Sequence, residues 1–171
     1  MGKIITPAVI TEHRQLNENT YLLEFSAPQI AGQVKPGQFL NIKTDKNQTA
    51  LLNHPFGVAS VSVEKGTLGI IYRVVGDFTR SLTSSQPGET LQVVGPLGNG
   101  FELTAKKPLL VGGGTGLAPL VFLASYLREK ELSVLMGGGQ RAICFGKIFI
   151  PLLPARFLPQ RMMALWEKKV P

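Results

Sequence analysis

The first hundred residues alternate short apolar stretches with turns rich in proline, glycine and charged side chains. Short stretches bounded in this way are typical of β-strands. Glu64-Lys65-Gly66 lies between two of them and predicts a hairpin. The predicted elements are strands at Ile4–Thr11, Thr20–Ser26, Gln38–Lys43, Val58–Val63, Leu68–Val74 and Thr90–Val94, and a short helix at Thr79–Ser84. Their number and spacing predict an antiparallel barrel or sandwich.

The hydrophobic pattern changes at Pro108. Leu109–Val111 predicts a buried strand, and a cluster of glycines leads from it into a predicted helix at Leu117–Lys130. Ser133–Met136 predicts the next strand, so this part of the chain forms one β-α-β unit. A parallel sheet needs further strands, but the residues after Gly138 show no clear period.

The composition indicates a globular protein of one domain or two small ones. Of the 171 residues, 44% are apolar and 17% are charged, which is typical of a chain with a hydrophobic core. Cys144 is the single cysteine, which excludes an internal disulfide and a cluster of cysteine ligands within this sequence. There is no run of about eighteen apolar residues and no apolar signal core near the N-terminus. We therefore expect a cytoplasmic protein that does not enter the membrane.

The net charge of +7 raises the question of a nucleic-acid partner, but its distribution argues against one. Residues 1–138 carry 12 basic and 10 acidic side chains, a balance of +2. Residues 139–171 carry 6 basic side chains and one acidic side chain, a balance of +5. Because the main part of the chain is nearly neutral and has no basic stripe with interleaved aromatic residues, we expect no nucleic-acid binding.

The most informative motif is the glycine cluster between the first predicted strand and helix of the β-α-β unit. It comprises Gly112, Gly113, Gly114, Thr115 and Gly116. A glycine turn before a helix lets a backbone approach a ligand, and the helix N-terminus suits a pyrophosphate. The cluster is not a P-loop, because it lacks the Lys-Ser/Thr pair. Pro119 stands where a Gly-x-Gly-x-x-Gly motif has its third glycine, so a tight turn without a ligand is an equal alternative from these residues alone.

Three other segments are weak signals individually. His54-Pro55-Phe56-Gly57 joins a loop to a strand, and a lone histidine is more often structural than catalytic. Tyr72-Arg73 is followed by Gly76-Asp77-Phe78-Thr79 at a possible helix start, and an arginine near a helix N-terminus can hold a phosphate. The glycine-punctuated stretch Gly95–Phe101 is typical of a boundary between two domains.

The order of the segments is more specific than any one of them. Tyr72–Leu82, Pro87–Glu89, Gly95–Phe101 and Val111–Pro119 together resemble the ferredoxin-reductase superfamily, over about residues 4–138. Within it, the chain is most similar to the family of electron-transfer subunits of heterotetrameric dihydroorotate dehydrogenases. The resemblance implies an FAD-binding β-barrel, an NAD-binding domain, and a 2Fe–2S cluster on four cysteines that this chain lacks. It also implies a catalytic dihydroorotate dehydrogenase subunit as partner, whose FMN exchanges electrons with NAD through the cluster and FAD in pyrimidine biosynthesis.

The resemblance also assigns cofactor-binding residues by position. His54–Gly57 matches the family's Arg-Pro-x-Ser flavin motif, with His54 in place of arginine and Gly57 in place of serine. Phe78-Thr79 matches a Gly-Thr pair at the pyrophosphate, with Phe78 departing. The assigned residues are His54, Pro55, Phe56, Gly57, Ile71, Tyr72, Arg73, Phe78 and Thr79 for FAD, and Gly112, Gly113, Gly114, Thr115 and Gly116 for NAD. No catalytic acid or base and no metal ligand is assigned.

These observations predict an all-β antiparallel Greek-key barrel followed by a truncated α/β Rossmann-like nucleotide-binding domain. The expected boundaries are 1–103 for the FAD-binding barrel, 104–138 for the start of the NAD-binding domain and 139–171 for an atypical tail. The predicted function is that of an oxidoreductase subunit for electron transfer, impaired by the truncation. The alternatives are a non-catalytic flavin- or partner-binding module and a subunit of a related sulfide or ferredoxin-NADP oxidoreductase.

The tail departs from the family pattern in a way that suggests a change of reading frame. Read from the last base of the Arg161 codon, with that base G, the fixed codons of Met162, Met163 and Trp166 permit Asp-Asp-Gly-Ser-Leu-Gly-Glu-Lys-Gly. This resembles an acidic glycine segment of the family's nucleotide domain. The hypothesis is that residues from about Gly139 onward are translated out of frame. The alternative is a genuine basic, proline-rich tail that binds a membrane surface or a partner.

Overall fold

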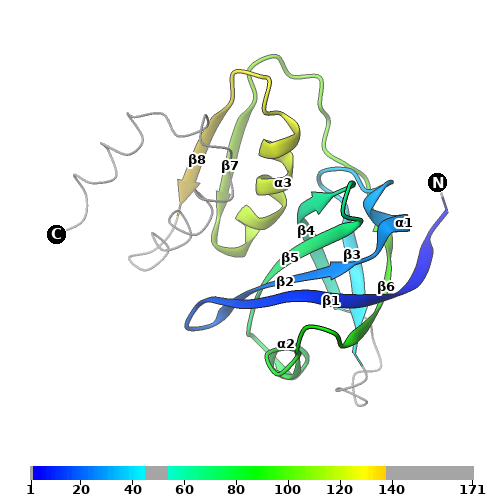
Figure 1. The fold of residues 1–171 in the computed structure, drawn as a ribbon. Coiled ribbons are helices and arrows are strands. Elements are labelled where there is room, and N and C mark those ends of the chain that lie inside the picture. The colour runs from blue at the N-terminus through cyan, green and yellow to red at the C-terminus, as the bar shows by residue number, and fades with distance from the viewer. Residues whose placement is uncertain (1, 45–53, 138–171) are drawn as a thin grey trace.

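Six antiparallel strands close into a barrel in a computed structural model that describes residues 2–44 and 54–137. The strands are β1 (Ile4–Asn17), β2 (Thr20–Ser26), β3 (Phe39–Lys43), β4 (His54–Ser62), β5 (Thr67–Arg73) and β6 (Thr90–Leu97). Their order around the barrel is β1-β2-β5-β4-β3-β6. Strands β3, β4 and β5 are consecutive neighbours and β6 returns beside β3, which is a Greek key. Figure 1 shows this arrangement.

Two short helices lie in the longer connections of the barrel. Helix α1 (Pro28–Ala31) joins β2 to β3, and α2 (Asp77–Leu82) joins β5 to β6. The barrel interior is filled by alternating side chains of the strands, as the period of two requires. Among the most deeply buried are Ile10, Leu23, Phe25, Leu40, Ile42, Val58, Leu68, Ile70 and Leu91.

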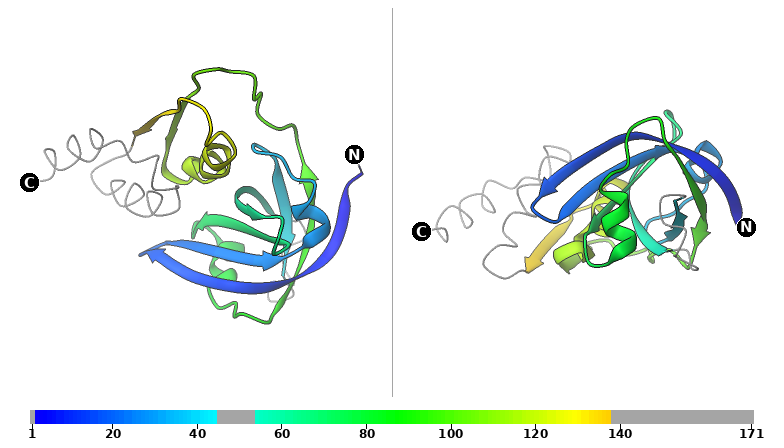
Figure 2. Two further views of the ribbon diagram at one scale, coloured as in Figure 1. Left: turned by 45° about the horizontal axis from the view of Figure 1, so that its top comes forward. Right: turned by 90° about the horizontal axis from the view of Figure 1, so that it is seen from below.

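A β-α-β unit follows the barrel. It comprises β7 (Leu109–Gly113), a 3₁₀ turn (Gly114–Leu117), α3 (Ala118–Tyr126) and β8 (Ser133–Gly137). Strands β7 and β8 are parallel, with Leu109 opposite Ser133 and Gly113 opposite Gly137. Figures 1 and 2 show α3 between this two-stranded sheet and the barrel.

Helix α3 is apolar on two sides because it packs against two structures. Leu123, Ala124 and Leu127 join Leu110 of β7 in one buried cluster. On the opposite side the cluster comprises Leu117, Ala118 and Val121 with Leu22, Ala59 and Ile71 of the barrel. A helix that is apolar all round is a buried helix. The β-α-β unit is therefore held on the outer face of β2, β4 and β5 by hydrophobic burial.

The predicted fold class is confirmed, and the element boundaries differ in detail. Strand β1 runs to Asn17 rather than to Thr11, because it continues its pairing with β2 as far as Thr20. Helix α3 is shorter than the predicted Leu117–Lys130. Its C-terminal side ends in a turn in which the Lys130 ammonium donates to the carbonyl oxygens of Leu103 and Ala105. The glycine-punctuated stretch from Gly95 begins inside β6.

The other predictions about the ends of the chain are not tested. The boundaries 1–103 and 104–138 stay predictions, and the proposed out-of-frame segment 139–171 lies outside the described residues. Across residues 2–44 and 54–137, no helix is long and apolar enough to cross a bilayer.

Candidate functional site

Three segments that the sequence assigned to a flavin meet at one end of the barrel. Strand β4 begins at His54 and runs antiparallel to β5, so its first residues lie beside the last residues of β5. Helix α2 starts only four residues after β5 ends. The barrel thus brings His54–Gly57, Ile71–Arg73 and Phe78–Thr79 together from separate parts of the sequence.

Aromatic contacts connect these three segments. The rings of His54 and Phe78 are stacked, with centroids 3.9 Å apart and planes inclined by 9°. Phe56 lies 6.1 Å from Phe78 and 6.2 Å from Tyr72, in the second case edge to face. Each segment contributes at least one ring, and Tyr72 and Phe78 are buried. His54 and Phe78, two of the positions at which the chain departs from the family pattern, are in direct contact.

His54 carries the one polar atom of this cluster that lacks a partner. Its Nδ1 atom is buried and has no hydrogen-bond partner among the residues that the structure describes. Buried side-chain nitrogens are nearly always paired, so this atom needs a group from outside the described protein. A phosphate oxygen of a bound nucleotide is such a group. Arg73, at the end of β5, adds an exposed guanidinium at the same end of the barrel.

Tyr72 is fixed by a hydrogen bond inside the barrel. Its hydroxyl lies 3.0 Å from Nε2 of His13, whose Nδ1 lies 2.8 Å from the Ser85 carbonyl oxygen. Because a carbonyl only accepts, His13 donates from Nδ1, and its neutral Nε2 accepts the Tyr72 hydroxyl proton. Burial, and secondarily the neighbouring Tyr21, raises the pKa of Tyr72 above its ordinary value. Tyr72 is therefore a neutral positioning group for the aromatic cluster.

The hydroxyl of Thr79 is used by the protein itself. It accepts hydrogen bonds from the backbone N–H groups of Val75 and Gly76, at 2.9 and 3.1 Å, and donates to the Gly76 carbonyl at 3.0 Å. A hydroxyl has one donor and two acceptor sites, so this one is saturated. Thr79 shapes the loop before α2, and any contact it makes to a ligand would come from its backbone. No signal in the sequence predicts this role.

The glycines of the turn differ in whether the fold itself requires a glycine at that position. A Cβ at Gly112 would lie 2.7 Å from Leu120 Cδ1, so this position must be small for β7 to pack against α3. Gly114 has φ of +55°, which disfavours other residues. A Cβ at Gly116 would meet nothing within 4 Å. The fold explains Gly112 and Gly114 without a ligand, whereas Gly116, together with exposed Gly113 and Thr115, leaves open space beside the turn.

The flavin segment and the glycine turn are close in space. A Cβ at Gly57 would be 3.6 Å from the Pro119 ring, at the start of α3. The end of the His54–Gly57 segment therefore borders the helix that follows the glycine turn. The His54–Gly57 segment and the start of α3 are therefore neighbours in space.

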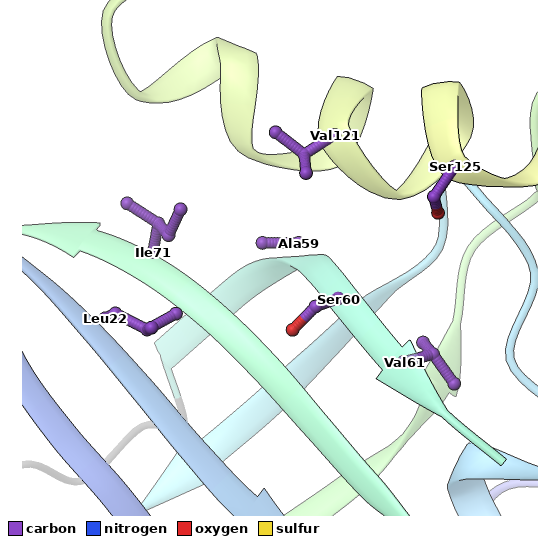
Figure 3. A pocket seen from close by; sticks show the side chains of 7 residues that line it. All are labelled: Leu22, Ala59, Ser60, Val61, Ile71, Val121 and Ser125. Atoms are coloured by element: carbon purple, nitrogen blue, oxygen red, sulfur yellow. The ribbon is translucent and has the colours of Figure 1, made fainter. Parts of the chain in front are cut away.

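A pocket of about 210 Å³ lies farther along the same interface (Figure 3). Val121 and Ser125 point from α3 toward the barrel strands. The lining residues are Leu22, Ala59, Ser60, Val61, Ile71, Val121 and Ser125. Only Ile71 belongs to the predicted site, and its side chain packs against α3. The volume is below that of ordinary drug-sized ligand pockets, so this cavity is not the dinucleotide site.

Comparison with known proteins assigns the chain to a family. The profile of the family described as "Oxidoreductase FAD-binding domain" matches residues 7–101, more than half of the chain. The chain belongs to this family. The matched residues include all six barrel strands in whole or in part, α2, and the three converging segments.

The names of curated relatives are more specific than the description of the family. The chain is 37% identical over 143 residues to "Dihydroorotate dehydrogenase B (NAD(+)), electron transfer subunit" of Desulforamulus reducens, covering 82% of this chain and 54% of the relative. The same subunit of Geobacillus thermodenitrificans is 37% identical over 142 residues, covering 80% and 55%. The chain thus spans about half the length of the curated relatives it matches.

Solved structures agree on the fold. The NADH-dependent reduced ferredoxin-NADP oxidoreductase, studied for flavin-based electron bifurcation, matches with a TM-score of 0.68 and 30% identity, covering 75% of this chain and 46% of its own. The ferredoxin reductase in carbazole 1,9a-dioxygenase matches with a TM-score of 0.72, covering 82% and 45%. At 22% identity, the second likeness concerns the fold alone.

Proposed function

We propose that this chain is the flavin-binding part of an electron-transfer oxidoreductase subunit and holds FAD at the end of the barrel formed by β4, β5 and α2. The observation that carries the proposal is the unpartnered, buried Nδ1 atom of His54 at the point where three predicted flavin segments converge. The family match over residues 7–101 supports the choice of FAD.

The residues divide into distinct roles in this proposal. His54 and Arg73 bind the phosphates, one through Nδ1 and the other through its guanidinium. Phe56, Tyr72 and Phe78 form the aromatic cluster against which His54 packs, and the saturated hydroxyl of Thr79 holds the loop that precedes α2. Pro55, Gly57 and Ile71 contribute the adjoining β4 and β5 backbone. When bound, FAD supplies the electron transfer, while the protein binds and orients it.

A pyridine nucleotide is the proposed partner of the glycine turn. Two observations support this proposal: Gly57 lies close to Pro119 at the start of α3, and the relatives are named as NAD(+) enzymes. The proposed NAD-binding residues are Gly112–Gly116, of which Gly116 is the glycine that packing does not explain.

The wider reaction is proposed from the resemblance to the family of electron-transfer subunits of dihydroorotate dehydrogenases, with which the relatives' names agree. A catalytic dihydroorotate dehydrogenase subunit with FMN would deliver electrons through a 2Fe–2S cluster and FAD to NAD, in a heterotetramer. This chain has one cysteine, so four cysteine ligands for that cluster are not contained in it. The complete electron path thus requires protein beyond the residues of this chain.

A non-catalytic flavin- or partner-binding module is the second candidate. It is favoured by the sheet β7-β8, which has two strands within residues 2–44 and 54–137, since parallel sheets normally have more strands and both faces covered. A third candidate, a subunit of a ferredoxin-linked NADP oxidoreductase, is favoured by the 30% identity to the solved enzyme of that kind.

Flavin loading of the purified chain tests these candidates. We expect a yellow protein with a flavin absorption band after incubation with FAD and gel filtration. Bleaching of the band by NADH under anaerobic conditions supports electron transfer, and a stable band supports the module. Colourless protein after FAD loading would refute the flavin assignment. Affinity capture with the FMN subunit of a dihydroorotate dehydrogenase, against a ferredoxin control, separates the two enzyme branches.

A further inference from the structure

The imidazole of His54 is held in place by stacking on Phe78, and one of its nitrogens has no hydrogen-bond partner among the described residues. Phe78 fixes the plane of the imidazole from one side, and Phe56 supports Phe78 in turn. The imidazole ring is thereby held with a buried Nδ1 atom that has no partner in the described parts of the chain. A fixed orientation with an unsatisfied nitrogen is the arrangement of a preformed ligand contact.

The chemistry of this contact depends on the charge of the imidazole. A neutral imidazole has one donor and one acceptor nitrogen, whereas the protonated ring has two donors. A phosphate oxygen accepts hydrogen bonds and carries negative charge, so it favours the protonated ring. The face of Phe78 also favours a cation stacked on it within about 6 Å.

The elements packed against His54 are β3, β5 and α2, and their nearest charged side chains along the chain are Lys43, Arg73, Asp77 and Arg80. Three of these four are cationic. A phosphate oxygen would supply both the missing hydrogen-bond partner and an anionic neighbour for the imidazole, which couples anion binding to proton binding.

We propose that His54, held on Phe78, makes the binding of a phosphate-bearing flavin at this site conditional on protonation of its imidazole. This inference rests on the proposed FAD site and adds its regulation. The sign follows from linkage: binding takes up a proton, so affinity falls as pH rises. Uptake of one proton changes the affinity by at most about tenfold per pH unit. An arginine at this position would give no such dependence, because it stays charged.

The test compares FAD with riboflavin, which has no phosphate, by quenching of flavin fluorescence on the full-length chain. Between pH 6 and pH 8 we expect the Kd for FAD to rise about tenfold or more, and that for riboflavin to change less than about twofold. Titration calorimetry in buffers of different ionisation enthalpy should show proton uptake with FAD. No binding of either flavin at any pH would overturn the proposed function together with this inference.

Three variants isolate the contribution of His54. H54R should bind FAD with little pH dependence and no proton uptake, and H54Q should bind FAD weakly at both pH values. H13Q alters the only other histidine and should keep the ratio between the two pH values, whatever its absolute affinity. If H54Q keeps the pH dependence, or if riboflavin follows FAD, this inference is wrong while the flavin site stands. F78L, which keeps apolar bulk without the aromatic face, should reduce the dependence.

Discussion

The hydroxyl of Tyr72 and Nε2 of His13 lie 3.0 Å apart and connect two strands that are not neighbours in the barrel. His13 belongs to β1 and Tyr72 to β5, with β2 between them. The ring of Tyr21 in β2 is stacked on that of Tyr72, with centroids 5.5 Å apart, and lies tilted at 5.4 Å from that of His13. The bond ties the end of the barrel that carries the candidate site to its longest strand.

Removal of this bond should destabilise the protein. Y72F leaves the half-buried Nε2 of His13 without its donor, and we expect a loss of about 1–2 kcal/mol in the free energy of unfolding, measured by urea denaturation. The matched control is Y126F, because Tyr126 is 60% exposed. Equal stability of Y72F and Y126F would contradict a structural role for the bond.

Stability should depend on the ionisation of Glu24. Burial, followed by repulsion from Glu12, raises the pKa of this carboxyl above its ordinary value of 4.5. A raised pKa means that the folded state favours the protonated form, so the contribution of Glu24 to stability falls as pH rises through and above 4.5. E24Q should therefore be more stable than the parent at pH 7 and similar to it near pH 4. Thermal unfolding at both values checks this, with E64Q at the exposed hairpin turn as control; a destabilised E24Q at pH 7 would refute it.

Position 69 requires glycine because a contact between side chains of β4 and β2 passes over it. Ser60 of β4 donates to Glu24 of β2 at 3.4 Å, directly over Gly69 of β5. A Cβ at Gly69 would collide with Ser60 Oγ. We expect G69A to cost about 1–3 kcal/mol in chemical denaturation. The double variant G69A/S60A should recover part of that loss, and additive effects would show that the collision is not the cause.

The packing of α3 against the barrel should depend on Val121. This side chain is 7% exposed and packs with Leu22, Ala59 and Ile71. A carboxylate buried there without a partner costs several kcal/mol, so V121D should speed proteolytic cleavage of the connection before α3 by at least about tenfold. Y126D places the same charge on the exposed side of the helix and should be cleaved at the parental rate. Unchanged cleavage of V121D would mean that α3 does not depend on this cluster.

DNA sequencing tests the reading-frame hypothesis. We expect the codons around Arg161–Val170, read one base earlier, to encode the acidic glycine segment described above, with an insertion or deletion upstream near codon 139. Sequencing independent isolates through codons 136–171 measures this directly. A third base other than G in the Arg161 codon, or an undisturbed frame in every isolate, would exclude it.

The sequence predicted local structure well where one force dominates. Strand β2 has the predicted bounds, Thr20–Ser26, because its alternating side chains match a strand with one face in the barrel interior. The glycine turn was also placed correctly between β7 and α3, since glycine permits tight backbone turns and proline restricts the backbone at a helix start. The sequence did not separate Gly112, which α3 requires, from Gly116, which nothing in the fold requires.

The candidate site was predicted as segments but not as an arrangement. The resemblance marked His54 and Phe78 as two separate departures from a family pattern, 24 positions apart. Only barrel closure stacks their rings and leaves Nδ1 of His54 without a partner. The saturated hydroxyl of Thr79 was likewise invisible, because its partners are backbone groups placed by the loop before α2.

By itself, the sequence determined the antiparallel strands, the change to a β-α-β unit at Pro108 and the glycine turn, because side-chain periodicity and backbone restriction act over a few residues. The tertiary structure decided which faces are buried and which side chains meet. Helix α3 shows the difference: its apolar residues predicted a helix, but only packing shows one side against β7 and the other against the barrel. Contacts between distant segments depend on how the strands close and register, and no local pattern encodes that closure.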